Sequence, residues 1–440
     1  MSEIVIGGST LAGLVDALAS DVERGAALYL NYDPISDRYL VDEVVVAGSD
    51  DCVTASVTEI TFAPQFLTRV TRCARQTKRC FALLHTHPSG FLGFSPTDDA
   101  TEATLVDFLN GRSDGRPCFS LVLCDGHLNA RRFGEGERVT VREVGSKVVF
   151  HGAAVAGQGE QRYDRQVRAF GEDGQAILRR LNVAIVGLGG TGSVTAQQLA
   201  YLGIRQFVLV DGDTVEDTNL NRVVGAGAAS VGRQKIEVAA EMIHRIADDV
   251  IVRSHVGSVM AAEAAKLLRT VDCIFICTDS HSSRTFLSAF AYQYLIPSFD
   301  IGVSINAHEG EVQAVTGRTQ MLAPGLPCLW CSNALNAARI REEIMTPEER
   351  AADPYFNEGG ARQPAVISIN STMVSLAVTM FLGAFTAIPA RARWQSYDAL
   401  TGRVGLLSSR IAPDCATCGP EGVIGDGPTK GLPFLPVEGV

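Results

Sequence analysis

The spacing of hydrophobic and polar residues changes along the chain and predicts two differently built parts. Up to about residue 150, short apolar runs of strand character alternate with two helices, the second of which follows Pro96 and runs toward Leu109. Apolar runs over 119–123 and 129–133 predict two further strands. From about residue 162 onward, strand, glycine-rich turn, helix and strand follow one another repeatedly. This order is typical of a parallel sheet flanked by helices, so we expect an α/β protein with two domains.

Glycine-rich stretches mark the expected boundaries. One separates the two patterns, and another, which also contains several prolines, ends the chain. We predict a first domain over 1–150, a linker over 151–161, a second domain over 162–424 and an irregular tail over 425–440. The most apolar late segment, Met373 to Ile388, is shorter than a membrane-spanning helix, so we interpret it as a buried helix.

Composition narrows the classes of function. The 440 residues suffice for two or three domains, and a formal net charge of −11 argues against binding of nucleic acid along the whole chain. One basic run on a predicted helix could form a local patch for nucleic acid, although a solvated helix face is the favoured interpretation: Arg69, Arg72, Arg75, Lys78 and Arg79. No signal peptide or membrane span is visible, and the 11 cysteines point to a reducing compartment. We expect a cytoplasmic protein that binds neither nucleic acid nor membrane.

The first part carries a His-x-His-Pro motif at 85–88, followed by Ser-x-x-Asp at 95–98. Residues two apart in a strand point to the same side, so His85 and His87 can reach one ion, and Asp98 can join them from a following helix. Three protein ligands leave one position for water, which zinc ionises near neutral pH for attack on an amide. The alternative is purely structural, because the second segment is also a good helix start.

The second part begins with an apolar strand, Val183 to Val186, that runs into a glycine-rich turn and a helix extending to Leu202. Glycines let backbone amides approach a phosphate closely, and the start of a helix adds partial positive charge. The turn contains Gly187, Gly189, Gly190 and Gly192. By itself this motif suits a nicotinamide or flavin enzyme equally well, with Asp211, at the end of the next strand, on a ribose.

Residues further along favour ATP over a dinucleotide. They are Asp213, Asn219, Arg222, Lys235 and Asp279. A dinucleotide oxidoreductase needs neither an Arg and a Lys at the phosphate end nor a second acid after a strand. An enzyme that positions a triphosphate, offsets its charge and holds Mg²⁺ needs them all. Taken singly, the two cations could lie at the surface and Asp279 could cap a helix.

Two cysteine pairs, Cys328 with Cys331 and Cys415 with Cys418, offer four thiolates for a tetrahedral zinc. We interpret this site as structural, because it would tie the segment after the first pair to the C-terminal part of the chain. Redox-active pairs are the alternative.

The motif over 85–98 resembles the signature of the JAB/MPN (JAMM) zinc metalloproteases, whose domain is built on a mixed sheet. The resemblance implies cleavage of peptide or isopeptide bonds that follow a ubiquitin-like protein. It also implies that Ser95 hydrogen-bonds the developing oxyanion or the zinc-bound water, and that an upstream glutamate handles the proton. We prefer Glu23 for that glutamate because it precedes an apolar run of strand character, whereas Glu43 and Glu59 could be outward-facing strand residues.

Residues from about 162 to 418 resemble the adenylyltransferases of the ThiF/MoeB and ubiquitin-activating type, which have a Rossmann-like, doubly wound domain. The motif Arg-Tyr-Asp-Arg-Gln at 162–166 matches the start of that family, and the resemblance implies that Arg165 reaches the triphosphate of a partner in a homodimer. It assigns the ribose to Asp211, the phosphates to Arg222 and Lys235, and Mg²⁺ to Asp279. The implied reaction is attack of a protein C-terminal carboxylate on the α-phosphate of ATP, which gives an acyl-adenylate and pyrophosphate.

Two departures from this family bear on the reaction. Residues 332–414 contain no cysteine that could form a thioester, so we expect the enzyme to stop at the adenylate and to pass it to a separate thiol protein. A hydroxyl acceptor such as Ser368 or Ser371 would be a much weaker nucleophile. Ser280 replaces an Asn often found at that position, which leaves the contacts to adenine or Mg²⁺ open.

Together the resemblances imply a bifunctional enzyme of a bacterial ubiquitin-like modification pathway, of a kind linked in part to phage defence. A zinc isopeptidase would trim or release a modifier ending in glycine, and the ATP-dependent half would adenylate that glycine for a conjugating enzyme. The alternative keeps both activities but places them in sulfur-carrier metabolism, where a sulfurtransferase converts the adenylate into a thiocarboxylate. A third possibility is that one half only binds the modifier.

Overall fold

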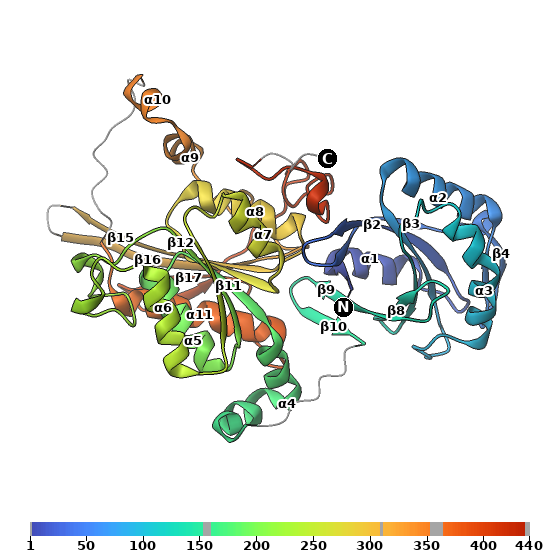
Figure 1. Ribbon diagram of the computed structural model, residues 1–440, viewed down its shortest axis with the longest axis horizontal. Helices are drawn as coiled ribbons and strands as arrows, with labels where there is room; N and C mark the ends of the chain where they lie inside the picture. The colour runs from blue at the N-terminus through green and yellow to red at the C-terminus, as the bar shows by residue number, and fades with distance from the viewer. Residues whose placement is uncertain (1, 153–159, 309–310, 353–363, 436–440) are drawn as a thin grey trace. The chain divides into compact units, whose positions relative to one another are not determined.

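The chain forms two compact units in the computed structural model, which describes residues 2–152, 160–308, 311–352 and 364–435 (Figure 1). The N-terminal unit contains the residues up to 152 together with Gln293–Leu295 and Val423–Lys430, and the C-terminal unit contains the other described residues. Most of the linker predicted over 151–161, and the last five residues of the predicted tail, lie outside the described residues.

The N-terminal unit is built on one mixed sheet with the strand order β1-β3-β2-β6-β7-β8-β9-β10, and β1 also pairs with β9, so the sheet closes on itself. The strands are β1 (Glu3–Gly7), β2 (Gly25–Asp33), β3 (Arg38–Val46), β6 (Cys80–Thr86), β7 (Cys118–Cys124), β8 (His127–Arg132), β9 (Arg138–Val144) and β10 (Val148–His151), with a separate hairpin of β4 (Cys52–Ala55) and β5 (Ile60–Phe62). The helices are α1 (Gly8–Ala17), α2 (Pro64–Thr77) and α3 (Pro96–Asn110).

The described residues of this unit therefore form three α-helices where the sequence pattern predicted two. Helix α1 follows β1 without a turn, and its N-cap is Gly7, which offers no side chain to cap it. The usual signals of a helix start are thus missing. Part of the predicted tail belongs to this unit: Asn31 Nδ2 donates to Gly425 O at 3.1 Å, so Val423–Lys430 is held against the N-terminal sheet.

The C-terminal unit contains a second sheet with the order β13-β12-β11-β14-β15-β16-β17-β18. Its strands are β11 (Asn182–Val186), β12 (Gln206–Asp211), β13 (Ile251–Val256), β14 (Cys273–Ile276), β15 (Ser298–His308), β16 (Glu311–Leu322), β17 (Trp394–Asp398) and β18 (Arg403–Leu406). The helices are α4 (Asp164–Arg180), α5 (Gly190–Leu202), α6 (Lys235–Ile246), α7 (Ala262–Arg269), α8 (His281–Gln293), α9 (Ala337–Ile344), α10 (Pro347–Ala352) and α11 (Ile367–Phe385). In the order of the sheet, the five strands β13, β12, β11, β14 and β15 run parallel, as predicted. The pairs formed by β15, β16, β17 and β18 are antiparallel, which the sequence pattern did not predict.

Helix α11 is shifted from the predicted segment: it begins at Ile367, six residues before Met373, and ends at Phe385, three residues before Ile388. At 19 residues it is long and apolar enough to cross a membrane by length and composition alone. Half of its apolar window is nevertheless buried, and Phe381 packs edge-on against Phe275 of β14 and Phe299 of β15. The helix is therefore part of the core of the C-terminal unit.

Candidate functional site

The two histidines of the 85–88 motif lie at the end of strand β6. Side chains of this strand alternate between two hydrophobic cores, with Phe81 and Leu83 in the core that also receives Leu109 of α3. His85 and His87 continue this alternation, so both point toward the side of the sheet that α3 covers. Both are buried, and their Nε2 atoms lie 3.1 Å apart.

Asp98 completes this cluster from the first turn of α3. Ser95 is the N-cap of the helix and accepts a hydrogen bond from Asp98 N at 3.2 Å, while Asp98 Oδ2 accepts one from Ser95 N at 2.6 Å. The segment therefore forms the helix start that the structural alternative requires, and Asp98 also faces the two histidines. Asp98 Oδ1 lies 3.1 Å from His85 Nε2, and Oδ2 lies 3.5 Å from His87 Nε2.

These distances fit a tetrahedral metal. Ligand atoms about 2.05 Å from a tetrahedral zinc lie about 3.3 Å from one another, which is close to the three separations between His85, His87 and Asp98. The main-chain oxygen of Phe91 lies 2.7 Å from His87 Nδ1 and fixes the proton there, which leaves the lone pair of Nε2 for an ion. Burial alone would raise the pKa of Asp98, but hydrogen bonds from the two histidines hold it well below its usual range.

Glu23 lies beside the cluster, just before β2. Its Oε1 atom is 3.8 Å from His87 Nε2, and the residue is only 3% exposed. Burial raises the pKa of its carboxyl, and the two histidines offset part of that rise. The rival glutamates have other surroundings: Glu43 pairs with Arg79 at 2.7 Å, whereas Glu59 is exposed on the β4–β5 hairpin, where its charge contributes to the raised pKa of Glu23.

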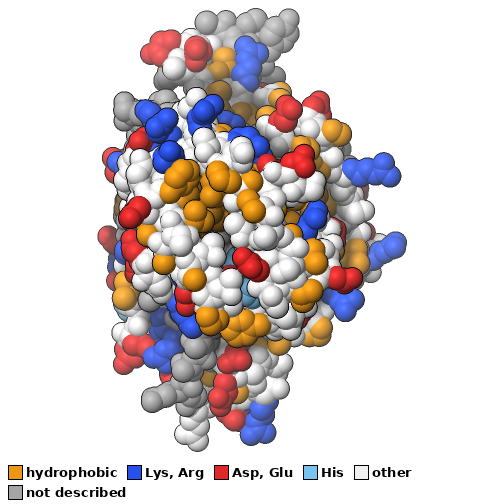
Figure 2. Space-filling view, turned by 90° about the vertical axis from the view of Figure 1, so that its right-hand side faces the viewer, with side chains coloured by type: hydrophobic (Ala, Val, Ile, Leu, Met, Phe, Trp, Pro, Cys, Tyr) orange, Lys and Arg blue, Asp and Glu red, His pale blue; other side chains and the backbone are white. Residues whose placement is uncertain are grey.

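The pocket that His85 and Asp98 help to line is partly open to solvent. Figure 2 shows a hollow in which a histidine is visible, with hydrophobic side chains on its rim. Exposed hydrophobic residues of this unit include Val53 and Val57 of the hairpin and Phe91, which stacks on His87 with ring centroids 6.0 Å apart. Glu23, His85, His87 and Asp98 thus form one largely buried cluster that the pocket reaches at His85 and Asp98, with three atoms placed to hold an ion and one carboxylate next to it.

In the C-terminal unit, the glycine-rich turn joins β11 to α5. Gly187 has φ +87°, a conformation that favours glycine, and a Cβ at Gly192 would collide with the main-chain oxygen of Gly187. A Cβ at Gly190 would collide with the amide of Asn370 and lie 3.4 Å from Cδ of Arg222. The backbone here is therefore closely packed, and Arg222 lies against it.

The other predicted nucleotide-binding residues follow the carboxyl ends of neighbouring parallel strands. Asp211, at the end of β12, accepts hydrogen bonds from Leu188 N at 2.5 Å and Asp213 N at 2.7 Å. Burial raises the pKa of Asp211, and these two hydrogen bonds counteract the rise. Lys235 Nζ pairs with Asp213 Oδ2 at 2.7 Å.

Asn219, Asp279 and Arg165 have different surroundings. Asn219 is buried, and its Oδ1 accepts a hydrogen bond from Glu216 N at 3.2 Å, so it shapes the loop after β12. Asp279 is exposed after β14, next to the strand that precedes the glycine turn. Arg165 is exposed in the first turn of α4. The edge of the sheet therefore gathers the predicted acids and cations around the turn, with the exception of Arg165, for which no contact to that edge is seen in the described residues.

Comparison with known proteins decides the family of this unit. Residues 163–418, more than half of the chain, match the model of the ThiF family. The chain belongs to the ThiF family. The molybdopterin-synthase adenylyltransferase of Escherichia coli (strain K12) is 30% identical over 269 residues, which cover 61% of this chain and 99% of that protein.

Other relatives of this ThiF-family chain match over part of their length. The adenylyltransferase and sulfurtransferase uba4 of Emericella nidulans is 29% identical over 278 residues, covering 61% of this chain and 54% of that protein. Ubiquitin-like modifier-activating enzyme 5 of Drosophila mojavensis is 33% identical over 185 residues, which cover 39% of this chain and 44% of that protein. Among solved structures, E. coli MccB with ATP has a TM-score of 0.46 at 18% identity and covers 59% of this chain and 75% of that one.

The four predicted cysteines also come together in the ThiF-family unit. Sγ of Cys328 lies 3.6 Å from that of Cys415, Sγ of Cys331 lies 3.6 Å from that of Cys418, and Cys415 and Cys418 are 3.7 Å apart. Thiolates bound to a tetrahedral zinc at about 2.3 Å would lie about 3.8 Å apart, so the four atoms fit such an ion.

One residue near the nucleotide edge was missed from the sequence. Glu343 of α9 accepts hydrogen bonds from Ser280 Oγ at 2.7 Å, His281 N at 3.0 Å and Ser282 N at 2.7 Å. Its carboxylate therefore caps the start of α8, directly after Asp279, and fixes α9 there. Burial would raise the pKa of Glu343, but these hydrogen bonds lower it below the ordinary value of a glutamate.

Glu343→Gln is expected to loosen α9, because the neutral amide loses charge-assisted hydrogen bonds to the start of α8. We expect trypsin to cut after Arg339 and Arg341 about tenfold faster at pH 7 than in the parent protein. Because the folded-state pKa is lowered, the carboxylate stabilises α9 at pH values above its ordinary pKa and loses this effect as the pH falls through the folded-state value. Glu348→Gln, which changes an exposed carboxylate of α10, is the control, and equal cutting of both variants at pH 7 would contradict the cap.

Proposed function

We propose that the ThiF-family unit is an ATP-dependent adenylyltransferase that activates the C-terminal carboxylate of a ubiquitin-like or sulfur-carrier protein. The observation that carries this proposal is family membership together with a relative named molybdopterin-synthase adenylyltransferase that aligns over 99% of its length. The proposal predicts exchange between ATP and pyrophosphate that depends on a carrier protein ending in glycine. Exchange that needs no carrier would contradict it.

In this reaction a carboxylate oxygen of the carrier attacks the α-phosphorus of ATP, the bond to the β-phosphate oxygen breaks, and pyrophosphate leaves. The backbone of the glycine turn and the start of α5 would bind phosphate, and Arg222 and Lys235 would offset its charge. Each oxygen of Asp211 accepts one backbone hydrogen bond and keeps a second lone pair for a ribose hydroxyl. Asp279 would hold Mg²⁺, an ion for which a carboxylate is a preferred ligand.

The relatives favour sulfur-carrier activation, the second of the two pathways considered from the sequence. Two bacterial relatives are named molybdopterin-synthase adenylyltransferases, and a fungal relative is named adenylyltransferase and sulfurtransferase. The absence of cysteine from 332–414 supports a reaction that ends at the adenylate, with a separate sulfurtransferase or conjugating enzyme taking the acyl group. We further propose that the unit works as a homodimer in which Arg165, exposed on α4, reaches the partner's triphosphate.

We propose a second function for the N-terminal unit: zinc-dependent hydrolysis of the peptide or isopeptide bond after the same glycine-ending protein. The observation that favours it is the fit of His85, His87 and Asp98 to a tetrahedral ion, with Glu23 beside them. A zinc ion held there would lower the pKa of a bound water toward neutrality. Glu23 would accept the proton of this water and deliver it to the leaving amine, while Ser95 would orient the first turn of α3 and hydrogen-bond the oxyanion.

The two metal sites predict the zinc content of the protein. We expect two zinc ions per chain by mass spectrometry of metals, one at each site. His85→Ala and Cys418→Ser are each expected to remove about one ion, because each takes away a ligand from a tetrahedral set. Cys418→Ser should also lower the melting temperature, since a structural site contributes directly to folding. Cys73→Ser, outside both clusters, is the control, and two retained ions in Cys418→Ser would refute the four-cysteine site.

A further inference from the structure

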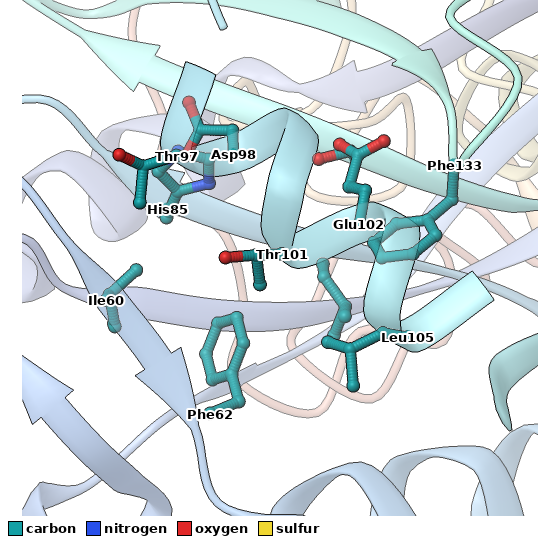
Figure 3. Close-up of a pocket in the computed structure, with 11 residues that line it drawn as sticks. Ile60, Phe62, His85, Thr97, Asp98, Thr101, Glu102, Leu105 and Phe133 are labelled. Carbon is teal, nitrogen blue, oxygen red and sulfur yellow. The ribbon is translucent and has the colours of Figure 1, made fainter. Parts of the chain in front are cut away.

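A pocket lies beside the proposed metal site, with about 460 Å³ of space between atoms that includes solvent at its mouth (Figure 3). Two of the metal-binding residues, His85 and Asp98, form one end of it. Ile60 and Phe62 of β5 form one wall, and Thr101 and Leu105 of α3 form another. Figure 3 shows the side chain of Thr101 in the middle of this group, across from Ile60 and Phe62. The pocket is therefore a direct extension of the site where the bond would be cut.

The lining of this pocket suits an apolar group. Its one charged residue away from the metal, Glu102, is already neutralised, because its carboxylate pairs with Arg131 at 2.8 Å and accepts a hydrogen bond from Gly134 N at 3.0 Å. A charged group seated here would lose its hydration without gaining a partner, whereas an aliphatic or aromatic group would leave water at little cost. The pocket should thus distinguish substrates by the polarity of one side chain.

Resting on the hydrolase function proposed above, we propose that this pocket binds an aliphatic or aromatic side chain of the substrate tail, next to the terminal glycine. The group in the pocket must belong to a residue near the scissile bond, because the pocket shares His85 and Asp98 with the metal site. The terminal glycine has no side chain to fill it, so a neighbouring residue must. The preferred substrates are then proteins whose tail carries a leucine-like residue immediately before its glycine or glycines.

Cleavage of short peptides tests this specificity in the full-length, zinc-loaded chain. The probes are acetyl-Gly-Ser-X-Gly-Ser-Lys and acetyl-Gly-Ser-X-Gly-Gly-Ser-Lys, with X as Leu, Ala or Asp, and products are quantified by mass spectrometry. In at least one series we expect kcat/KM for Leu to exceed that for Ala by about tenfold or more, and Asp to be the poorest. These peptides have no aromatic reporter that could itself occupy the pocket.

A matched pair of variants on α3 locates the effect. Thr101→Phe places a ring in the pocket and should reduce the advantage of Leu over Ala to less than about twofold, since the space is already filled. Thr104→Phe adds the same ring on an exposed position of the same helix, outside the pocket lining, and should keep the advantage of the parent protein. Thermal unfolding of both variants shows whether they are folded.

The possible outcomes distinguish failure of the proposed pocket from failure of the proposed hydrolase function. Equal cleavage of the Leu and Ala peptides, or an advantage of Leu that survives in Thr101→Phe, overturns the pocket but leaves the hydrolase in place. Binding of fluorescein-labelled Gly-Ser-X-Gly-Gly acids is measured in parallel by anisotropy. Selective binding of the Leu acid without any cleavage supports the pocket and refutes the hydrolase. Neither cleavage nor selective binding overturns both.

Discussion

Glu23→Gln is expected to lower the rate of hydrolysis about a thousandfold while the zinc content of the His85 site stays the same. Glutamine has nearly the same shape as glutamate but cannot accept the proton of a metal-bound water at neutral pH, and a positioned general base contributes about 10²–10⁴ in rate. Glu23 is placed for this role because its carboxylate lies 3.8 Å from His87 Nε2, close to the ion but beyond the ligand separations. The substrate is a carrier protein that supports ATP–pyrophosphate exchange, extended by a reporter beyond its glycine.

Glu59→Gln is the matched control for this variant. Glu59 precedes strand β5 and is exposed, and it was an alternative candidate for the base on sequence grounds alone. We expect Glu59→Gln to cleave at the parent rate. If Glu23→Gln remains active with zinc bound, either another group moves the proton or the N-terminal unit is not the hydrolase.

Asp279→Asn is expected to reduce carrier-dependent ATP–pyrophosphate exchange by about a hundredfold or more. The amide removes the negative charge that would hold Mg²⁺ against the triphosphate, and electrostatic positioning provides most of the catalysis in such reactions. Asp279 is exposed at the edge of the sheet, so its replacement should leave the melting temperature within about 1 °C.

Asp248→Asn provides the control for adenylation. Asp248 is also exposed in the C-terminal unit, after α6 and before β13, so the substitution removes the same charge away from the glycine turn. It should exchange at the parent rate. ATP–pyrophosphate exchange that persists in Asp279→Asn would show that another residue holds Mg²⁺. Neither Asp279→Asn nor Asp248→Asn should release zinc from the cysteine cluster.

The sequence predicted the site residues that lie close to one another along the chain or belong to a recognisable local motif. The two histidines are two positions apart on one strand, and Asp98 belongs to a helix start that local signals identify, so their convergence could be anticipated. The ThiF family was predicted from the glycine turn and the spaced acids and cations, and the comparisons confirm it. Glu23 was selected only because an apolar strand follows it, and the structure brings it close to the histidines.

Features that depend on distant parts of the chain were not predicted. Strands β16 and β17 pair although more than 70 residues separate them, and no local pattern specifies that register. The contact of Glu343 with the start of α8 joins residues 61–63 positions apart, and the pocket beside the metal site needs β5, α3 and β6 at once. Such contacts arise from packing, so they become visible only in three dimensions.

The carboxylate of Asp98 belongs at once to the start of a helix and to the proposed metal site. One of its oxygens closes the hydrogen-bonded ring with Ser95, and the other faces His85. An ion that binds the folded helix start more tightly than the frayed helix start stabilises the folded form. Folding of the helix start strengthens the binding of the ion by the same free energy. On the proposed function, the affinity for zinc would consequently be a property of the whole first turn of α3, and Pro96 would influence it without being a ligand.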